Sequence, residues 1–428
     1  MLTEPQLATL FAQAQAAASQ QHWAIAIQLY QQAEALAPQE FRLPNNRANA
    51  HWLSDQPQPA LEAYRRAILL EPADHRPWRG LGNALRDLNR FEQADRAFAQ
   101  ASQLDDSAET AWNHSQVLIG LERYSEAWAL SERRLAMPTN RSYRCSPAWD
   151  GEQQVPAGGL SIWSEQGFGD TFQFLRWLLP LTAQLGDQPL QLEVEPALVT
   201  LLQQGLAWLP RPPAVVAKQE TPPAVPAHAS LMSLPSRLGG GTLAAEAFAS
   251  GPYLRLPAAP PAGPGRRIGV VWAAGRKLSE AFTTREYRKR SLPPEALEQL
   301  LRGLHRLGLG PVNLQVGADR DELEPALAEL FVDALDPGAD FLAAGQRIQQ
   351  LPAVVSVDTA MAHQCGAQGV RCHTLLPWSA DPRWLRERSD TPWYPSLQLW
   401  RQGPERRWEP VIDQLLNHLR TIPPSDPG

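Results

Sequence analysis

The sequence predicts a mixed fold class, in which an α-helical solenoid is followed by two α/β lobes with parallel sheets. The first third of the chain repeats itself every 34 residues, which predicts stacked helical hairpins. From residue 160 onward, short apolar runs alternate with helical patterns, which is typical of parallel sheets. A segment of Pro, Ala and Gly from Pro257 to Gly265 interrupts this alternation and divides it into two lobes.

The repeat has the period of a tetratricopeptide repeat. Small residues allow two antiparallel helices to approach, an aromatic residue fills the wedge between hairpins, and a proline closes the unit. The matching positions are Ala26, Tyr30, Ala33 and Pro38, then Ala60, Tyr64, Ala67 and Pro72, then Ala94, Phe98, Ala101 and Asp106. We therefore expect three repeats and a capping helix pair over residues 1–137. The capping pair, Glu109 to Leu135, has lost one residue between its helices. The alternative is an unrelated helical bundle.

Polar side chains recur on the first helix of each hairpin, at the positions that line the concave groove of such an array. They are Arg42, Asn45, Asn49, Arg76, Arg79, Asn83 and Asn113. Asparagine amides can hold an extended peptide by its backbone, and arginines can clamp carboxylates. The pattern predicts a protein or peptide acceptor in the groove. The alternative is a wall that is solvated or that docks against the chain's own lobes.

The remaining chain is divided by its composition. We expect a linker at 138–159, a first lobe at 160–257, a hinge at 258–265 and a second lobe at 266–428. The predicted strands are Leu160–Ser164, Leu190–Val194, Ile268–Trp272, Pro311–Val316, Ala353–Val357 and Val370–Leu376. The predicted helices start at Thr171, Pro196, Ser291, Thr359 and Val411, and Pro210 to Pro226 is predicted as a surface loop. Ligands of such folds bind at the carboxyl ends of the strands.

The strongest local motif is the apolar run Val354 to Val357 followed by Asp358, Thr359 and a helix start. The free amides of residues 360–362 and the helix dipole are suited to a diphosphate, to which the Thr359 hydroxyl and His363 can donate. Asp358 can accept hydrogen bonds from sugar hydroxyls. The alternative is that Asp358 or Thr359 is only an N-cap and that His363 is a partly buried helix residue.

A second motif is the glycine loop Glu165-Gln166-Gly167-Phe168-Gly169-Asp170-Thr171. Its glycines allow the backbone to approach a ligand, and Asp170 stands at a helix start. A carboxylate at this place can deprotonate an acceptor hydroxyl as that hydroxyl attacks an anomeric carbon. The alternative is a capping aspartate in a tight turn between a strand and a helix.

Together these segments resemble the heptosyltransferase-like family 9 glycosyltransferases, in particular the bacterial form that carries tetratricopeptide repeats. The resemblance covers essentially the whole chain. It rests on Tyr124 to Trp128, Pro147 to Gly151, Glu165 to Phe174, Ser233 to Pro235, Gly269 to Ala273, Arg290 to Leu292, Leu314-Gln315, Ser356 to His363 and Pro392 to Pro395.

The resemblance implies a GT-B fold of two Rossmann-like lobes, a nucleoside-diphosphate sugar bound mainly by the C-terminal lobe, and no metal or other cofactor. It implies that Asp170 is the general base of an inverting transfer. The family's donor-contacting segment falls on Asp358, Thr359 and His363. We expect Gly167, Gly169, Gln315 and Ala360 to complete the donor-binding set. Trp393 and Tyr394 offer a stacking platform, although core packing is the simpler interpretation.

The chain departs from the family pattern after Trp272, where relatives have Gly-Asn and a His before the Arg-Ser pair. Here Ala274 begins an insert that runs to Lys289. Its basic residues, with Lys277 and Arg290 as the main candidates, are placed to neutralise a leaving diphosphate. The alternative is a solvated loop, and the departure leaves the donor open.

The bulk properties exclude several other classes of function. The net charge is −6 and Lys and Arg form no long run, so a nucleic-acid partner is not expected. Three cysteines without metal-ligand spacing, and no apolar stretch near 20 residues, predict a cytoplasmic chain without a transmembrane segment. Three functions remain: sugar transfer to a protein, peptide or glycan acceptor; a non-catalytic scaffold with a degenerate transferase domain; and a sugar epimerase or nucleotide-sugar hydrolase.

Overall fold

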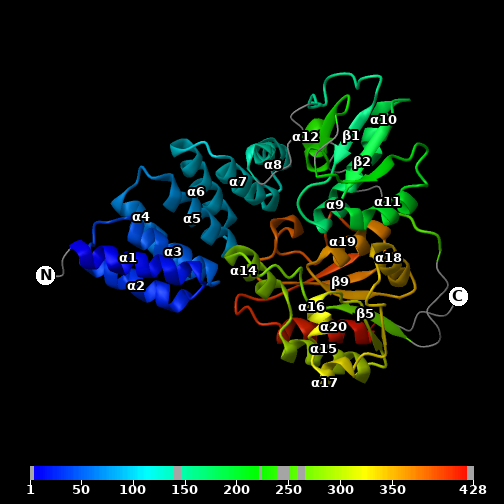
Figure 1. Cartoon of the computed structure of the whole chain (residues 1–428). Helices are drawn as coiled ribbons and strands as arrows, with labels where there is room; N and C mark the ends of the chain where they lie inside the picture. Colours follow the sequence, from blue (N-terminus) through cyan, green and yellow to red (C-terminus); the bar gives the residue numbers. More distant parts are fainter. Residues whose placement is uncertain (1–3, 139–145, 221–223, 240–250, 259–265, 422–428) are drawn as a thin grey trace. The chain divides into compact units, whose positions relative to one another are not determined.

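The computed structural model describes residues 4–138, 146–220, 224–239, 251–258 and 266–421 (Figure 1). The chain forms two compact units. The first holds residues up to 138 together with 277–289 and 379–386, and the second holds 139–276, 290–378 and 387–428. Most of the predicted hinge at 258–265, and residues 139–145 of the predicted linker, lie outside the described residues.

The first unit begins with four antiparallel helical hairpins. Their helices are α1 (Glu4–Ser19), α2 (Trp23–Leu36), α3 (Arg42–Leu53), α4 (Pro57–Leu70), α5 (His75–Asp87), α6 (Phe91–Leu104), α7 (Ala108–Gly120) and α8 (Tyr124–Ser131), followed by the 3-10 turn η1 (Glu132–Ala136). The small and aromatic residues that repeat every 34 positions lie on α2, α4 and α6 and are buried. The predicted tetratricopeptide-like array is confirmed by this arrangement.

A left-handed residue ends the first helix of every hairpin. These residues are Gln21, Asp55, Asn89 and Glu122, with φ of 59°, 62°, 57° and 59°. Their numbers rise by 34, 34 and then 33, so the fourth pair has lost one residue between its helices, as the sequence predicted. Glycine takes this conformation without steric cost, whereas other L residues do not.

Replacing Glu122 with glycine should therefore stabilise the array by about 0.5–1 kcal/mol, since the relief of backbone strain outweighs the added freedom of the unfolded chain. The free energy of unfolding from denaturant titration measures the effect. Gln103 lies exposed within α6, where glycine should instead cost about 1 kcal/mol. Equal effects of the two substitutions would contradict this account.

Two later segments of the chain pack on the helical array within the first unit. One contains most of α14 (Ala281–Arg290), and the other contains the 3-10 turn η5 (Pro382–Trp384). Arg386 forms an ion pair with Glu92 at 2.9 Å, and its guanidinium lies over the Phe91 ring. The alternative of a solvated loop is wrong for the later part of the insert, because residues 281–290 form a helix, whereas residues 275–280 are exposed and lie outside any helix or strand.

Arg285 of α14 is buried against the ends of α3 and α5. Its guanidinium pairs with Asp87 and, at 3.0 Å, with Asp55, and it lies 4.9 Å from the centre of the Trp52 ring. The Trp52 Nε1 also donates to Asp87 at 2.7 Å, and Phe282 stacks on Trp52. Burial alone would raise the pKa of the Asp87 carboxyl, but the Arg285 guanidinium holds it well below its ordinary value.

The second unit contains two parallel sheets. The four-stranded sheet has the order β3-β2-β1-β4 and the six-stranded sheet β10-β9-β8-β5-β6-β7. Their strands are β1 (Leu160–Trp163), β2 (Leu190–Val194), β3 (Ala214–Ala217), β4 (His228–Ser230), β5 (Arg267–Val271), β6 (Gly310–Asn313), β7 (Asp333–Ala334), β8 (Val354–Val357), β9 (Cys372–Leu376) and β10 (Leu397–Arg401). All named pairings are parallel, so the prediction of parallel-sheet α/β structure is confirmed.

Helices connect and cover these strands. They are α9 (Phe168–Phe174), α10 (Leu178–Leu185), α11 (Val199–Gly205), α12 (Leu234–Arg237), α15 (Pro294–Arg306), α16 (Ala318–Asp321), α17 (Pro325–Ala328), α18 (Phe341–Gln349), α19 (Ala360–Gln368) and α20 (Glu409–Thr421), with the 3-10 turns η2 (Leu175–Trp177), η3 (Pro196–Leu198) and η4 (Leu231–Ser233). The helix expected from Ser291 begins at Pro294, since proline suits a first helical position. The expected loop at 210–226 is wrong in part, because it contains β3.

A segment before the hinge ties the two sheets' helices together. The backbone amides of Tyr253 and Leu254 donate to the carbonyl of Ala367 in α19, and that of Arg255 donates to Gly205 in α11. The Tyr253 hydroxyl donates to the carbonyl of Phe172 in α9 at 2.6 Å. Helices that follow strands of different sheets are thereby bonded to the same short segment, residues 253–255.

Candidate functional site

The starts of two helices meet in the second unit, and each helix follows a strand of a different sheet. Strand β1 leads through Gly167 into α9, and β8 leads through Thr359 into α19. A Cβ added to Gly169 would lie 2.8 Å from Cδ2 of His363, so only glycine permits this approach. Phe168 packs edge-on against Phe341 of α18, with ring centres 4.9 Å apart. The structure thus brings the two sequence motifs together at their first helical turns.

Asp170 is the third residue of α9. It is half-buried, and its Oδ2 accepts a hydrogen bond from the Gly167 amide at 2.9 Å. Helix α9 begins at Phe168, three residues before the expected start. Asp170 therefore lies inside the first turn, and its carboxylate bonds back to the Gly167 amide that precedes the helix. The carboxylate therefore has a structural task, and it stands one residue from the contact between Gly169 and His363.

Thr359 is the N-cap of α19. Its Oγ1 accepts from the Met361 amide at 3.2 Å and lies 3.2 Å from the Ser356 hydroxyl. The expectation that the amides of residues 360–362 are all bare is wrong, because the amide of 361 is bonded to this hydroxyl. Thr359 and Ala360 are half-buried, whereas Met361 and Ala362 are buried, so Ala360 is the residue of this first turn whose amide lies nearest the surface.

Asp358 and His363 are buried beside this turn, with 4% and 3% of their surface exposed. The His363 Nε2 lies 4.0 Å from Asp358 Oδ1, and its Nδ1 lies 2.8 Å from the Tyr394 hydroxyl. The Arg290 guanidinium donates to the Asp358 carbonyl at 3.3 Å and lies 4.0 Å from its carboxylate. One cation and one imidazole thus face the Asp358 carboxylate.

Three further residues were predicted to contact the donor: Gln315, Lys277 and Arg290. Gln315 is buried, and its Oε1 accepts from the amides of Trp272 and Ala273 at 3.1 and 3.0 Å, so the side chain holds the chain that leaves β5. Lys277 is exposed and belongs to the first unit. Arg290, the other predicted diphosphate contact, lies in the second unit and contacts the Asp358 segment.

Sequence reasoning missed a buried arginine behind His363. The Arg176 guanidinium lies among the rings of Tyr253, Trp393 and Tyr394, at 5.1, 5.6 and 5.2 Å, and donates to the Trp393 carbonyl. Trp393 and Tyr394 are each 1% exposed, so core packing is the correct interpretation of that aromatic pair. The available signal was the single charge of Arg176 within the apolar run 174–181.

The predicted groove residues lie on the first helices of the hairpins. Arg42, Arg76 and Arg79 pair with Glu40, Asp74 and Glu109, so the wall is less basic than its sequence indicates.

The groove asparagines have contrasting settings. Asn49 accepts from the Tyr64 hydroxyl at 2.6 Å. Asn45 and Asn83 are more than nine-tenths buried, and their Oδ1 atoms have no hydrogen-bond partner among the described residues. Asn113 is half-buried on α7.

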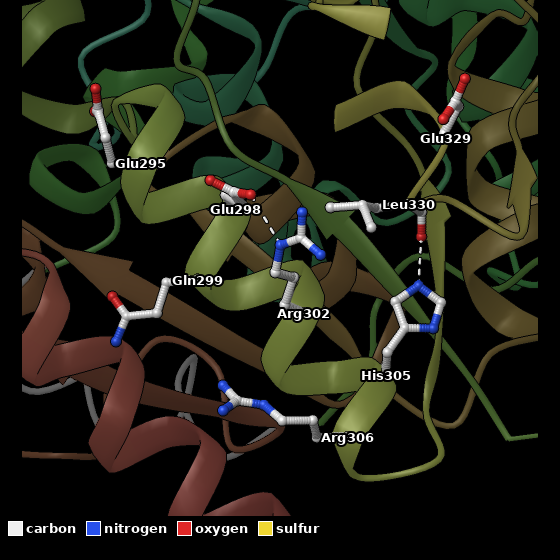
Figure 2. A pocket seen from close by; sticks show the side chains of 8 residues that line it. All are labelled: Glu295, Glu298, Gln299, Arg302, His305, Arg306, Glu329 and Leu330. Carbon is white, nitrogen blue, oxygen red and sulfur yellow. Dashed lines mark hydrogen bonds and ion pairs between the residues drawn. The ribbon is translucent and has the colours of Figure 1, made fainter. Parts of the chain in front are cut away.

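A separate hollow runs along α15, as Figure 2 shows. Arg302 turns to Glu298 at 2.8 Å, and His305 contacts the Leu330 carbonyl at 2.6 Å. Charges of both signs line the hollow, with Arg302 and Glu298 paired, and none of its residues belongs to either sequence motif. No helix in the described part of the chain is long and apolar enough to cross a membrane.

Fold and site define a class: a tetratricopeptide-like helical array joined in one chain to a parallel-sheet α/β unit in which two helix starts converge. No protein-family model matches the chain. A curated relative is the protein FlbA of Caulobacter vibrioides, 26% identical over 400 residues, which cover 83% of this chain. The chain spans only 63% of the length of that relative.

Three similar solved structures each cover less than a third of this chain. The Sgt2 TPR domain from Aspergillus fumigatus is 24% identical and covers 32% of this chain and 88% of its own, with a TM-score of 0.27. The first TPR of Spaghetti (RPAP3), bound to an HSP90 peptide, is 19% identical over 28% of this chain and 97% of its own, with a TM-score of 0.28. The MamA protein is 14% identical over 31% of this chain and 74% of its own, with a TM-score of 0.30.

Proposed function

We propose that the second unit is a GT-B glycosyltransferase that moves a sugar from a nucleoside diphosphate to an acceptor, with inversion at the anomeric carbon and without a metal. One observation carries the proposal. Gly169 lies directly against the His363 ring, so the turn that contains Asp170 packs beside the turn that contains Asp358 and Thr359. A base and an anion-binding helix start are the two groups that such a transfer needs on opposite sides of the reacting carbon.

In the proposed step, Asp170 takes the proton of the acceptor hydroxyl as its oxygen bonds to the anomeric carbon. The bond from that carbon to the diphosphate oxygen breaks, and the diphosphate leaves with the electron pair. The amide of Ala360, the dipole of α19 and the Arg290 guanidinium receive the developing negative charge. His363 donates to the phosphate or the ribose, and Asp358 accepts from a sugar hydroxyl.

The test is a binding screen of the full chain with ADP, UDP, GDP and CDP, followed by turnover assays with their sugars. Saturable binding of at least one nucleotide, together with sugar transfer to an added acceptor, supports the proposal. Donor turnover without acceptor identifies an epimerase or a hydrolase instead. The absence of any nucleotide-dependent thermal shift would contradict the proposal that the second unit is an enzyme acting on a nucleotide sugar.

The array is proposed to hold the acceptor, as a peptide or protein segment. Support comes from Asn45 and Asn83, whose buried amide oxygens lack partners among the described residues, because an unpartnered buried acceptor costs about 1–3 kcal/mol until a donor fills it. A peptide amide is such a donor. The arginines of the wall are already paired with carboxylates, so we expect backbone recognition to matter more than the charge of the acceptor.

Replacing Asn83 with alanine should weaken acceptor binding by about five- to tenfold, the worth of one net hydrogen bond. Nucleotide binding should stay as it is in the parent chain. Calorimetric titration of the acceptor and of the nucleotide measures both. Asn417 is exposed on α20, and its alanine variant serves as the control. An unchanged acceptor affinity in the Asn83 variant would remove the groove from the proposal.

The second candidate is a non-catalytic scaffold, and a specific observation favours it. Asp170 and Thr359 both cap the helices on which they lie, and Gln315 bonds to backbone, so three of the predicted site side chains have structural tasks. A scaffold would keep those bonds without any nucleotide. The binding screen separates the two candidates, because only the transferase requires a nucleotide site.

A further inference from the structure

A second polar hollow lies at the amino ends of β9 and β10. Arg371 precedes β9, His373 is its second residue, Ser396 precedes β10, and His418 of α20 closes the side. In a parallel sheet the amino ends and the carboxyl ends form opposite edges. Asp358 follows the carboxyl end of β8, so this hollow is separate from the candidate transfer site.

The His373 ring presents a hydrogen-bond donor to this hollow. Trp400 Nε1 lies 3.3 Å from His373 Nδ1 and donates to it, so Nδ1 carries no proton and Nε2 carries one. His373 is 1% exposed, and its Nε2 has no partner among the described residues. Most buried donors in proteins are satisfied, and an orphan that lines a hollow points to a ligand.

Three other side chains around the hollow, those of Arg371, Ser396 and His418, can donate hydrogen bonds, and the Gln398 amide beside them is neutral. The Ser396 hydroxyl is buried without a partner, and the exposed Arg371 guanidinium has no ion-pair partner, in both cases among the residues that the structure describes. His418 lies with its ring centre 5.6 Å from that of His373. No carboxylate of the described residues lines the hollow. Donors and cations without an acid select an anion.

Protonation of His373 is consistent with this chemistry. Burial, together with the nearby His418 and Arg371, lowers the pKa of the His373 ring to about 4. Strands β8 and β10 pair Val355 and Gln398 with His373 and bring no charge. At neutral pH the ring is a neutral Nε2–H donor, and a bound anion would favour its protonated form.

We propose that this hollow binds a small oxyanion, such as a phosphate or a carboxylate, through His373 Nε2–H, the Ser396 hydroxyl and the Arg371 guanidinium. A tetrahedral or planar anion can accept from all three donors at once. The site is independent of the proposed sugar transfer, because it shares no residue with it.

The test is NMR of the full chain labelled with ¹⁵N-histidine, titrated with inorganic phosphate at constant ionic strength. We expect a saturable shift of His373 Nε2 and a rise of the His373 pKa from about 4 to about 5 or higher. Arg371→Gln should weaken phosphate binding about tenfold or more, and Arg371→Lys should weaken it less. Arg302→Gln on α15 removes an exposed arginine elsewhere and should leave binding as it is.

A parallel titration with acetate identifies the source of the oxyanion. A shift with phosphate alone assigns a phosphate group, and an equal shift with acetate assigns a carboxylate; both outcomes support the proposal. The same response to chloride, no saturable shift, or full binding by Arg371→Gln would overturn it.

Discussion

Replacing Asp87 with alanine is expected to release α14 from the helical array. Asp87 and Arg285 are each 3% exposed, and removal of one partner from a buried ion pair costs about 3–5 kcal/mol because the other charge stays buried and unpaired. The same substitution removes the acceptor of the Trp52 indole. Hydrogen exchange of the amides 281–289 should accelerate by about 100-fold or more, which is the local opening that this loss implies.

The exposed pair of Arg79 and Glu109 is the matched control on the same array. Its side chains are 24% and 55% exposed, so Arg79→Ala should cost less than about 1 kcal/mol and leave exchange of α14 unchanged. The folded pKa of Asp87 is depressed, so its pair stabilises fully above the ordinary carboxyl pKa and progressively less as pH falls toward the folded value. The difference in stability between the parent chain and Asp87→Ala should therefore shrink below about pH 4. If the amides of residues 281–289 exchanged at the same rate in the parent chain and in Asp87→Ala at neutral pH, the pair of Asp87 and Arg285 would not be what holds α14 on the array.

Asp170→Asn is expected to abolish most sugar transfer and to spare nucleotide affinity. General-base catalysis by a positioned carboxylate contributes about 10²- to 10⁴-fold, and an amide cannot take the proton of the acceptor hydroxyl. The asparagine oxygen can still accept from the Gly167 amide, so the first turn of α9 should stay intact. Initial rates and nucleotide titration of the same preparation measure the two effects.

Asp150 gives the control for this change. Its carboxylate accepts from the amides of Glu152 and Gln153 in a turn of the second unit and belongs to neither motif. Asp150→Asn should transfer sugar at the parent rate. Retention of full activity by Asp170→Asn would remove Asp170 from the mechanism, while loss of both activity and nucleotide binding would point to a structural role for this carboxylate.

The helical array could be predicted because its pattern is local. Small and aromatic residues at Ala26, Tyr30 and Ala33 recur in phase, and each hairpin is closed by nearby residues. The strands with continuous apolar runs, such as β8, were also predictable. Strands β3, β4, β7 and β10 were not predicted. Strands β4 and β7 have only three and two residues, β3 lies in the proline-rich stretch 210–226, and β10 has the polar residues Gln398 and Arg401 among its five.

Helix α14 could not be predicted, because its sequence is polar and its burial depends on residues nearly 200 positions away. Arg285 reads as a solvated cation until Asp87 and Trp52 are placed around it. The same reason hid Arg176, whose three aromatic neighbours come from distant segments. The residues of the two motifs were predictable from spacing, whereas their capping bonds and the fit of Gly169 against His363 depend on tertiary structure.

The account depends on a donor diphosphate lying at the start of α19, opposite the turn of Asp170. A crystal structure of the full chain with a nucleoside diphosphate identified by the binding screen tests this directly. We predict a phosphate oxygen within about 3 Å of the amide of Ala360, with Asp170 facing the same space. A nucleotide bound elsewhere on the chain, with no phosphate at α19, would contradict it.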